Sequence, residues 1–205
     1  MAQVLKKEIK DKIIEATKNE VLKKGVKDSS LREIAANAGI TVGNLYRYFK
    51  CKDDIINSIT SPTLIKLNEM VKAVTNYQVS FENDLSLVEF NSDDLMEMLN
   101  QLASGLAKLY VENKEAMIIL IKYSKEVSYI KDWFKNIVSI LISKNKQLNL
   151  EDEELNSELS RTIASSVIAG IEECLLSNNL SLNEIERLLK IYFRAFVSML
   201  EIEGE

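Results

Sequence analysis

The sequence contains no histidine, and its 205 residues include only one proline, one tryptophan, two cysteines and six glycines. Histidine is the side chain that most often acts as a general base or a metal ligand near neutral pH. A glycine-rich phosphate loop and the glycine-flanked serine of a nucleophile elbow are missing as well. We therefore expect a protein that is not an enzyme, with no catalytic residues, no cofactor and no metal site.

Long apolar runs are also missing. None approaches the roughly 18 residues that a membrane-spanning helix needs, and the lysine-rich start lacks the apolar region of a signal peptide. We expect a cytoplasmic protein that does not contact a membrane. The two cysteines, Cys51 and Cys174, stand far apart in the sequence and form no metal-type cluster, so a disulfide framework is not expected.

Because helix breakers are few and apolar residues recur every three or four positions, the sequence predicts an all-α fold with about nine helices. The single proline, Pro62, should kink the fourth helix near Ile59 or break it locally. Residues 76–92 show no clear period and are predicted to form a loop. The predicted helices lie at about 5–24, 30–38, 41–48, 52–75, 93–111, 114–125, 128–146, 152–177 and 181–202.

Residues 29–52, SSLREIAANAGITVGNLYRYFKCK, have the pattern of two short helices joined by a glycine turn. Ser30 followed three residues later by Glu33 is typical of a capping box that begins the first helix. Gly39 can adopt a positive φ, which ends that helix and turns the chain. Thr41 is placed to cap the second helix. The segment therefore predicts a helix-turn-helix motif.

The second helix of this motif has one face for the core and one that suits DNA. Leu45 and Phe49 are four residues apart and should face inward. Asparagine can pair with an adenine edge, arginine with a guanine edge, and tyrosine with a phosphate. The alternative is an ordinary solvated helix in an all-α protein. The side chains expected to face outward are Asn44, Tyr46, Arg47 and Tyr48.

The residues Ile13 to Ala16, Gly25 and the run IAANAGITVGNLYRYFKCKDDI from Ile34 to Ile55 resemble the N-terminal DNA-binding domain of the TetR family of bacterial repressors. The resemblance covers about residues 8–57 without an insertion. It implies a helix-turn-helix DNA-binding domain at 1–52 and a helical ligand-binding and dimerisation domain at 53–205.

That resemblance also implies which residues touch DNA, with Val42 to Asn44 nearest to the base edges. Ser30, or Ser29 beside it, would meet a phosphate at the start of the first motif helix. The implied contacts are Ser30, Arg32, Thr41, Val42, Gly43, Asn44, Tyr46, Arg47, Tyr48 and Lys52.

Two residues depart from the family pattern. Glu20 stands where the family usually has a leucine, and Cys51 stands where a serine or an asparagine usually caps the next helix. Both are expected to lower stability, because cysteine is a poor cap. A redox switch at Cys51 is an alternative to a plain weak cap, since a helix N-terminus stabilises a thiolate.

Charge is unevenly distributed along the chain. Its net charge is −5, which alone would argue against nucleic acid. Residues 1–60, however, carry 12 Lys or Arg and 8 Asp or Glu, net +4, whereas residues 61–205 carry 14 and 23, net −9. A basic N-terminal module on an acidic body favours binding to DNA phosphates. The segment with Lys6, Lys7, Lys10 and Lys12 either reaches DNA or forms a solvated helix end.

The last predicted helix has apolar residues around well over half of its circumference. A helix that packs only against its own domain needs one stripe of apolar residues. The additional apolar residues form a second stripe, which indicates a second packing partner. The resemblance implies a homodimer formed by the last two helices, in which Ala169 and Gly170 would allow close approach. The alternative is that both stripes are buried within one subunit. A dimer would place two recognition helices on the half-sites of a palindrome.

The resemblance further implies a small-molecule effector cavity enclosed by helices within about 52–177. Because the helix that begins at Lys52 joins the DNA-binding domain to this region, we expect an effector to release the operator by shifting that helix. Methionine and aromatic side chains suit such an adaptable pocket, although they suit an ordinary core equally well. An alternative function is an effector-independent DNA-binding or protein-interaction adaptor with the same fold. The candidate ligand contacts are Met70, Met96, Tyr110, Met117, Tyr123, Trp133 and Phe134, with Tyr77 in the same region.

Overall fold

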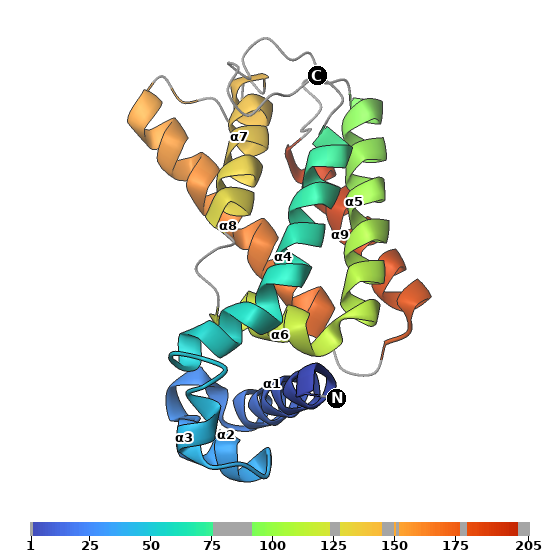
Figure 1. Cartoon of the computed structure of the whole chain (residues 1–205). Coiled ribbons are helices and arrows are strands. Elements are labelled where there is room, and N and C mark those ends of the chain that lie inside the picture. Colours follow the sequence, from blue (N-terminus) through green and yellow to red (C-terminus); the bar gives the residue numbers. More distant parts are fainter. Residues whose placement is uncertain are drawn as a thin grey trace. The chain divides into compact units, whose positions relative to one another are not determined.

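The computed structural model describes residues 2–75, 92–123, 128–144, 150, 152–176 and 180–200. All regular secondary structure within these ranges is helical, which confirms the all-α class (Figure 1). The predicted loop at 76–92 lies outside the described residues, except for Ser92. The helices are α1 (Ala2–Asp28), α2 (Leu31–Asn37), α3 (Val42–Leu45), α4 (Lys52–Thr75), α5 (Ser92–Glu112), α6 (Lys114–Tyr123), α7 (Ser128–Lys144), α8 (Glu153–Leu176) and α9 (Leu182–Leu200).

The ends of α1 and α3 differ from the prediction for local reasons. Gly25 has φ 85° and ψ 163°, so the regular part of α1 ends before it and one further turn follows. The α-helix of α3 ends at Leu45, because the Tyr46 amide makes the last consecutive bond to a carbonyl four residues back and the amides of Arg47 and Tyr48 bond three residues back. The chain also remains helical through Pro62, so the predicted local break in α4 is wrong.

No helix in the described parts of the chain is both long enough and apolar enough to cross a bilayer. The chain divides into two compact units by packing. The first comprises Met1–Lys66 and Asn113–Ser124, and the second comprises Leu67–Glu112 and Lys125–Glu205. Helix α6 therefore packs with the first unit although it follows α5 in sequence. The functional boundary predicted at residue 52 stays a prediction.

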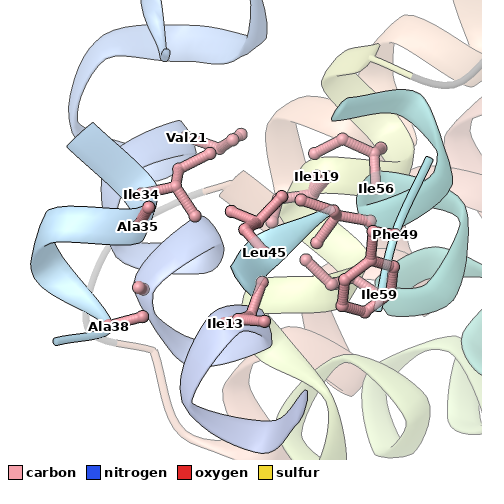
Figure 2. Packing of buried hydrophobic residues seen from close by; sticks show 12 residues of the cluster. Ile13, Val21, Ile34, Ala35, Ala38, Leu45, Phe49, Ile56, Ile59 and Ile119 are labelled. Carbon is pink, nitrogen blue, oxygen red and sulfur yellow. The ribbon is translucent and has the colours of Figure 1, made fainter. Parts of the chain in front are cut away.

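The core of the first unit contains side chains from α1, α2, α3 and the start of α4, together with one from α6, which lies far from them in sequence. Ile13 and Val21 of α1, Ile34 of α2 and Leu45 of α3 have no exposed surface (Figure 2). Ile119 of α6 is also fully buried and joins the same cluster. Burial of such a side chain stabilises the fold by about 1.5–3 kcal/mol. The cluster therefore holds the two motif helices against α1 and α6.

In the second unit α9 packs against α5 and α8, and α7 packs against α8 (Figure 1). Phe134 of α7 and Phe193 of α9 are both buried, with their ring centroids 6.4 Å apart. On α5, a Cβ atom added to Gly105 would meet the sulfur of Met70 at 2.3 Å. The missing side chain at Gly105 thus lets Met70 of α4 lie against α5.

Candidate nucleic-acid interface

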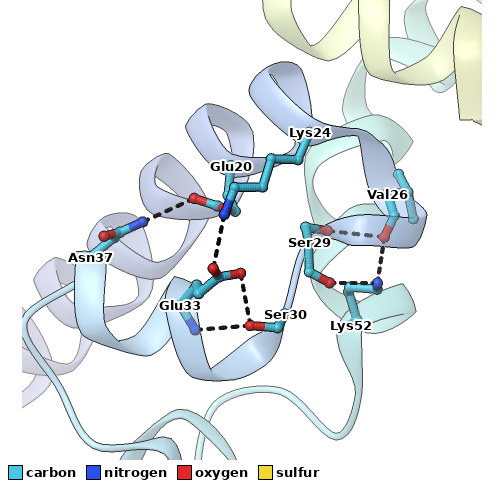
Figure 3. Close-up of polar contacts among 8 residues, drawn as sticks. All are labelled: Glu20, Lys24, Val26, Ser29, Ser30, Glu33, Asn37 and Lys52. Carbon is cyan, nitrogen blue, oxygen red and sulfur yellow. Dashed lines mark hydrogen bonds and ion pairs between the residues drawn. The ribbon is translucent and has the colours of Figure 1, made fainter.

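The N-terminus of α2 is held by the capping box that the sequence predicts. The backbone N–H of Glu33 donates to the hydroxyl of Ser30 (3.2 Å), and that hydroxyl donates to the Glu33 carboxylate (2.9 Å; Figure 3). The same carboxylate forms an ion pair of 2.8 Å with Lys24 of α1. Lys24 and Ser30 together lower the pKa of Glu33. The first turn of α2 is therefore joined to α1 by charge as well as by its core.

Glu20 extends this network into the interior, a contact that the sequence pattern does not reveal. Its side chain is buried, forms an ion pair of 2.6 Å with Lys24 and accepts a hydrogen bond of 3.1 Å from the Asn37 amide (Figure 3). Hydrogen bonds to the carboxylates of Glu20 and Glu33 raise the pKa of Lys24. Both ends of α2 are thus tied to α1. The carboxylate at a position where leucine is usual therefore has polar partners.

The turn between α2 and α3 confirms the predicted role of Gly39. Its φ is 70°, in the left-handed region that glycine adopts without strain. The Gly39 amide donates to the carbonyl of Ala36 and the Ile40 amide to that of Ala35, both at 3.0 Å. This pair of bonds is the Schellman arrangement, which satisfies the last carbonyls of a helix. It sets the direction in which the chain enters α3.

The α3 segment (residues 41–49) begins with the predicted cap and then tightens. The Thr41 hydroxyl accepts a hydrogen bond of 3.2 Å from the Asn44 amide. After Leu45, the amides of Arg47 and Tyr48 bond to the carbonyls three residues earlier, at 3.1 and 2.9 Å. This is the geometry of a 3₁₀ turn, which winds more tightly than an α-helix. The expected helix at 41–48 is therefore α-helical only over Val42–Leu45.

Burial within the α3 segment agrees with the predicted faces. Leu45 and Phe49 are buried, whereas Tyr46 keeps 54% of its surface exposed although it is a large aromatic residue. Five of the implied DNA contacts are exposed, namely Arg32, Thr41, Gly43, Tyr46 and Arg47. The other five are half-buried, namely Ser30, Val42, Asn44, Tyr48 and Lys52. All ten lie in the first unit, on α2, the α3 segment and the start of α4.

Lys52 has a role that its sequence position does not reveal. Its ammonium group donates to the backbone carbonyls of Val26 and Ser29 (2.8 Å; Figure 3). It also donates to the carbonyl of Lys27 at 3.5 Å. These carbonyls follow the kink of α1, where the helix leaves acceptors without partners. The first residue of α4 therefore caps the end of α1. Cys51 immediately precedes α4, where the sequence placed it, and its thiol is free and exposed.

The candidate effector residues are divided between the two units. Met117 is buried in α6 of the first unit, and Tyr123 of the same helix lies with its hydroxyl oxygen 3.3 Å from the position of a Cβ added to Gly25. Tyr110 and Phe134 are buried in the second unit, whereas Met70 and Met96 are half-buried there. The side chain of Trp133 and all of Tyr77 lie outside the described residues.

An open groove of about 520 Å³ lies along α9, and its described lining residues include none of the candidates whose side chains the structure describes. In its wall the Glu186 carboxylate accepts from the Ser104 hydroxyl of α5 (2.8 Å) and pairs with Lys190 (2.5 Å). Lys190 and Ser104 together lower the pKa of Glu186. The described lining residues all belong to α9, and they are Asn183, Glu186, Arg187, Lys190, Ile191 and Arg194.

Helix α9 also carries large apolar side chains that its own chain does not cover. Leu188, Ile191 and Met199 are 37%, 54% and 57% exposed. At about 100° per residue they fall within about 80° of one another around the helix, on the side away from the buried Leu189 and Phe193. We call Leu188, Ile191 and Met199 the outer apolar face of α9. The predicted second apolar stripe is therefore not buried within the subunit.

Residues 13–59 match the family described as bacterial regulatory proteins, tetR family. No curated protein matches the chain in sequence.

Among solved structures, a TetR-like transcriptional regulator from Rhodococcus sp. RHA1 is similar, with a TM-score of 0.59, 15% identity, and coverage of 92% of this chain and 96% of that one. The fatty acid degradation regulator FadR from Bacillus halodurans has a TM-score of 0.52 at 16% identity, covering 92% and 94%. SmeT, the repressor of the Stenotrophomonas maltophilia multidrug efflux pump SmeDEF, has a TM-score of 0.53 at 14% identity, covering 93% and 89%. These likenesses show a common fold.

Proposed function

Because this chain belongs to the TetR family of bacterial regulatory proteins, we propose that it is a cytoplasmic transcriptional repressor that binds a palindromic operator as a homodimer and releases it when a small molecule binds. One observation carries the DNA-binding part. The α3 segment is anchored by buried Leu45 and Phe49, while Tyr46 and Arg47 beside them remain exposed. Rigid support with an exposed polar face is what base and phosphate contacts require.

Gly43 allows a direct test, because its position separates stability from DNA contact. A Cβ atom added to Gly43 would meet no atom within 4 Å. Gly43→Ala should therefore keep or raise the stability of the free protein, by up to about 1 kcal/mol, since alanine favours a helix. The same methyl group should weaken operator binding if DNA lies against α3. Equal affinity of both proteins for a selected duplex, measured by fluorescence anisotropy, would contradict the proposed interface.

Two further variants separate base contacts from phosphate contacts. Asn44→Ala should relax discrimination at one base step by about 1–3 kcal/mol. Tyr46→Ala should weaken binding to all sequences alike if its hydroxyl meets a phosphate. Arg161→Ala is the control, because Arg161 is exposed on α8, where its guanidinium pairs with the exposed Glu158. Unchanged operator affinity in both α3 variants would show that this helix does not recognise the DNA sequence.

The outer apolar face of α9 supports the homodimer. Exposed apolar side chains in a row on one helix are typical of a surface that another subunit covers. Ile191→Glu should place a charge in that interface and shift the sedimentation coefficient to that of a monomer. Lys108→Glu is the control, since Lys108 is exposed on α5, outside the two helices proposed to form the interface. A dimer that persists in Ile191→Glu would place the interface elsewhere.

Effector release is proposed to act through α4. This helix is continuous from Lys52, which caps α1, to Thr75 in the second unit. A shift of α4 would move the contact between Lys52 and the end of α1, so a ligand needs a differential affinity of only about 1–3 kcal/mol. Calorimetric titration of an effector with and without operator should give different affinities. Equal affinities would show that the ligand is not an inducer.

An effector-independent regulator is the second candidate, and a specific observation favours it. Tyr110 and Phe134 are buried in the packed second unit, and no candidate ligand contact is among the described lining residues of the groove on α9. A thermal-shift screen of apolar and amphipathic compounds distinguishes the two functions. A compound that both raises the melting temperature and releases DNA favours the inducible repressor. Operator binding that no stabilising compound alters favours the second candidate.

A further inference from the structure

Lys10 of α1 lies beside the end of the α3 segment. Its ammonium nitrogen is 5.5 Å from the centroid of the Phe49 ring, within the range of a cation–π contact. Phe49 is held in the core and retains only 4% of its surface. The ring therefore provides a fixed support for a charged side chain that is itself exposed. This places a positive charge next to Tyr48 and Lys50, where the chain leaves the α3 segment.

Lys6 stands one helical turn before Lys10 and is also exposed. Residues four apart share a face of a helix, so the two ammonium groups are presented on the same side of α1. Within the described part of the chain neither lysine forms an ion pair. Their charges are therefore not neutralised by a carboxylate of the first unit.

Lys52 differs from Lys10 in the partners of its ammonium group. An ammonium group has three N–H donors, and Lys52 directs its donors at three backbone carbonyls of Val26, Lys27 and Ser29. A phosphate would have to compete with these contacts. Lys10 has its ammonium group on the face of a ring, where the outward N–H groups remain available to an anion.

We propose that Lys10 binds a backbone phosphate of duplex DNA next to the bases that the α3 segment faces, with Lys6 extending the same contact along α1, and that Lys52 is a positioning residue. The inference rests on the proposed DNA-binding function. It adds α1 to the DNA surface and removes the Lys52 ammonium group from it. The phosphate contact supplies affinity without sequence preference, because every nucleotide carries the same phosphate.

The test is the salt dependence of affinity for a duplex that the wild-type protein selects from a random-sequence pool. Each phosphate contact contributes about 0.9 to the slope of log K against log salt concentration. Lys10→Met keeps an apolar stem over Phe49 and removes one charge from each subunit of the proposed dimer, so the magnitude of the slope should fall by about 1.8. Raising salt from about 50 to 200 mM should then weaken the wild type about 12-fold more than the variant. Lys10→Arg should restore the slope.

Lys12→Met is the matched control for Lys10. Lys12 is exposed on the same helix but lies about 200° further around it, so it faces another side. Its slope should equal that of the wild type. A slope that is unchanged in Lys10→Met, or lowered equally in Lys12→Met, overturns the specific role of Lys10. A wild-type protein that selects no duplex overturns the proposed function instead.

Lys52→Gln tests the positioning role. The amide can still donate to the carbonyls that follow α1 but carries no charge, so the fold is retained. The slope should stay at the wild-type value. Lys52→Met, which keeps no donor, should lower the melting temperature. A slope reduced by about 1.8 in Lys52→Gln would show that Lys52 binds phosphate in both subunits and would overturn its assignment.

Discussion

The side-chain amide of Asn37, at the end of α2, donates a hydrogen bond of 3.1 Å to the buried carboxylate of Glu20 in α1. Seventeen residues of sequence separate the two. The other carboxylate oxygen of Glu20 faces Lys24, which in turn pairs with Glu33 in the first turn of α2. The orientation of α2 therefore depends on polar contacts at both of its ends. Since α2 leads directly into the turn before α3, these contacts also orient the α3 segment.

Removal of the Glu20 carboxylate should destabilise the first unit. Glu20→Ala leaves the Asn37 amide without its acceptor and should lower the free energy of unfolding by about 1–3 kcal/mol. The measurement is urea denaturation followed by circular dichroism. Glu15→Ala is the control, because the Glu15 side chain is 58% exposed and its ion pair with Lys18 is 3.6 Å long; its effect should stay within about 0.5 kcal/mol. Equal effects would contradict the role of the buried carboxylate.

The contact between Lys24 and Glu33 should make stability depend on acid pH. Lys24 and Ser30 hold the pKa of Glu33 below its usual 4.5. A lowered folded-state pKa means that the contribution is complete above the unfolded pKa and is lost as pH falls through the folded pKa. Glu33→Gln should therefore melt below the wild type at pH 7, and the gap should close as pH falls below 4.5. A gap that is independent of pH would show that charge contributes nothing.

Gly39 should tolerate asparagine better than alanine. No atom lies within 4 Å of an added Cβ, so only the backbone φ of 70° opposes substitution. Alanine in this conformation costs about 1–2 kcal/mol, whereas asparagine adopts it more readily. Urea denaturation should rank the wild type first, then Gly39→Asn, then Gly39→Ala. The opposite order for the two variants would mean that sterics, not φ, determine this position.

Gly170 should be intolerant for the opposite reason. A Cβ added there would lie 2.1 Å from the hydroxyl oxygen of Tyr192 and 2.2 Å from its ring carbon Cζ. The ring must then move, and its hydrogen bond of 3.1 Å to the Ser166 carbonyl is lost. Gly170→Ala should cost about 1–3 kcal/mol in thermal unfolding. Ala169→Ser, at the exposed neighbouring position, should change stability by less than about 0.5 kcal/mol.

Much of the helix-turn-helix geometry could be predicted because its causes are local. The Ser30 cap and its bond with Glu33, the left-handed Gly39 and the Thr41 cap each involve residues within a few positions of one another. The extent of α4 was likewise predictable as 52–75, since periodicity and breakers act along the chain. The length of α3 was overestimated. The amides of Arg47 and Tyr48 bond to carbonyls three residues back, but the spacing of the apolar residues is still that of an α-helix.

Contacts between distant segments could not be predicted in the same way. The position of Lys52 in the sequence predicts a phosphate contact. Its ammonium group instead donates hydrogen bonds to backbone carbonyls some 25 residues earlier. Lys10 is one of several N-terminal lysines, and only packing places it over Phe49. The placement of Met117 and Tyr123 in the first unit has the same origin, because α6 packs against α1 rather than with its neighbours in sequence.

The sequence by itself determined the all-α class, the motif and the face of the α3 segment, because caps, a glycine turn and apolar spacing act over one or two helical turns. The tertiary structure alone decided which charges remain available to a partner. Contacts within the first unit engage the charged groups of Glu20, Lys24 and Lys52. The side chains of Tyr46 and Arg47, in contrast, stay exposed. An ammonium or carboxylate group forms hydrogen bonds with polar partners within about 3 Å of it. Which partners lie that close depends on how the chain brings distant residues together.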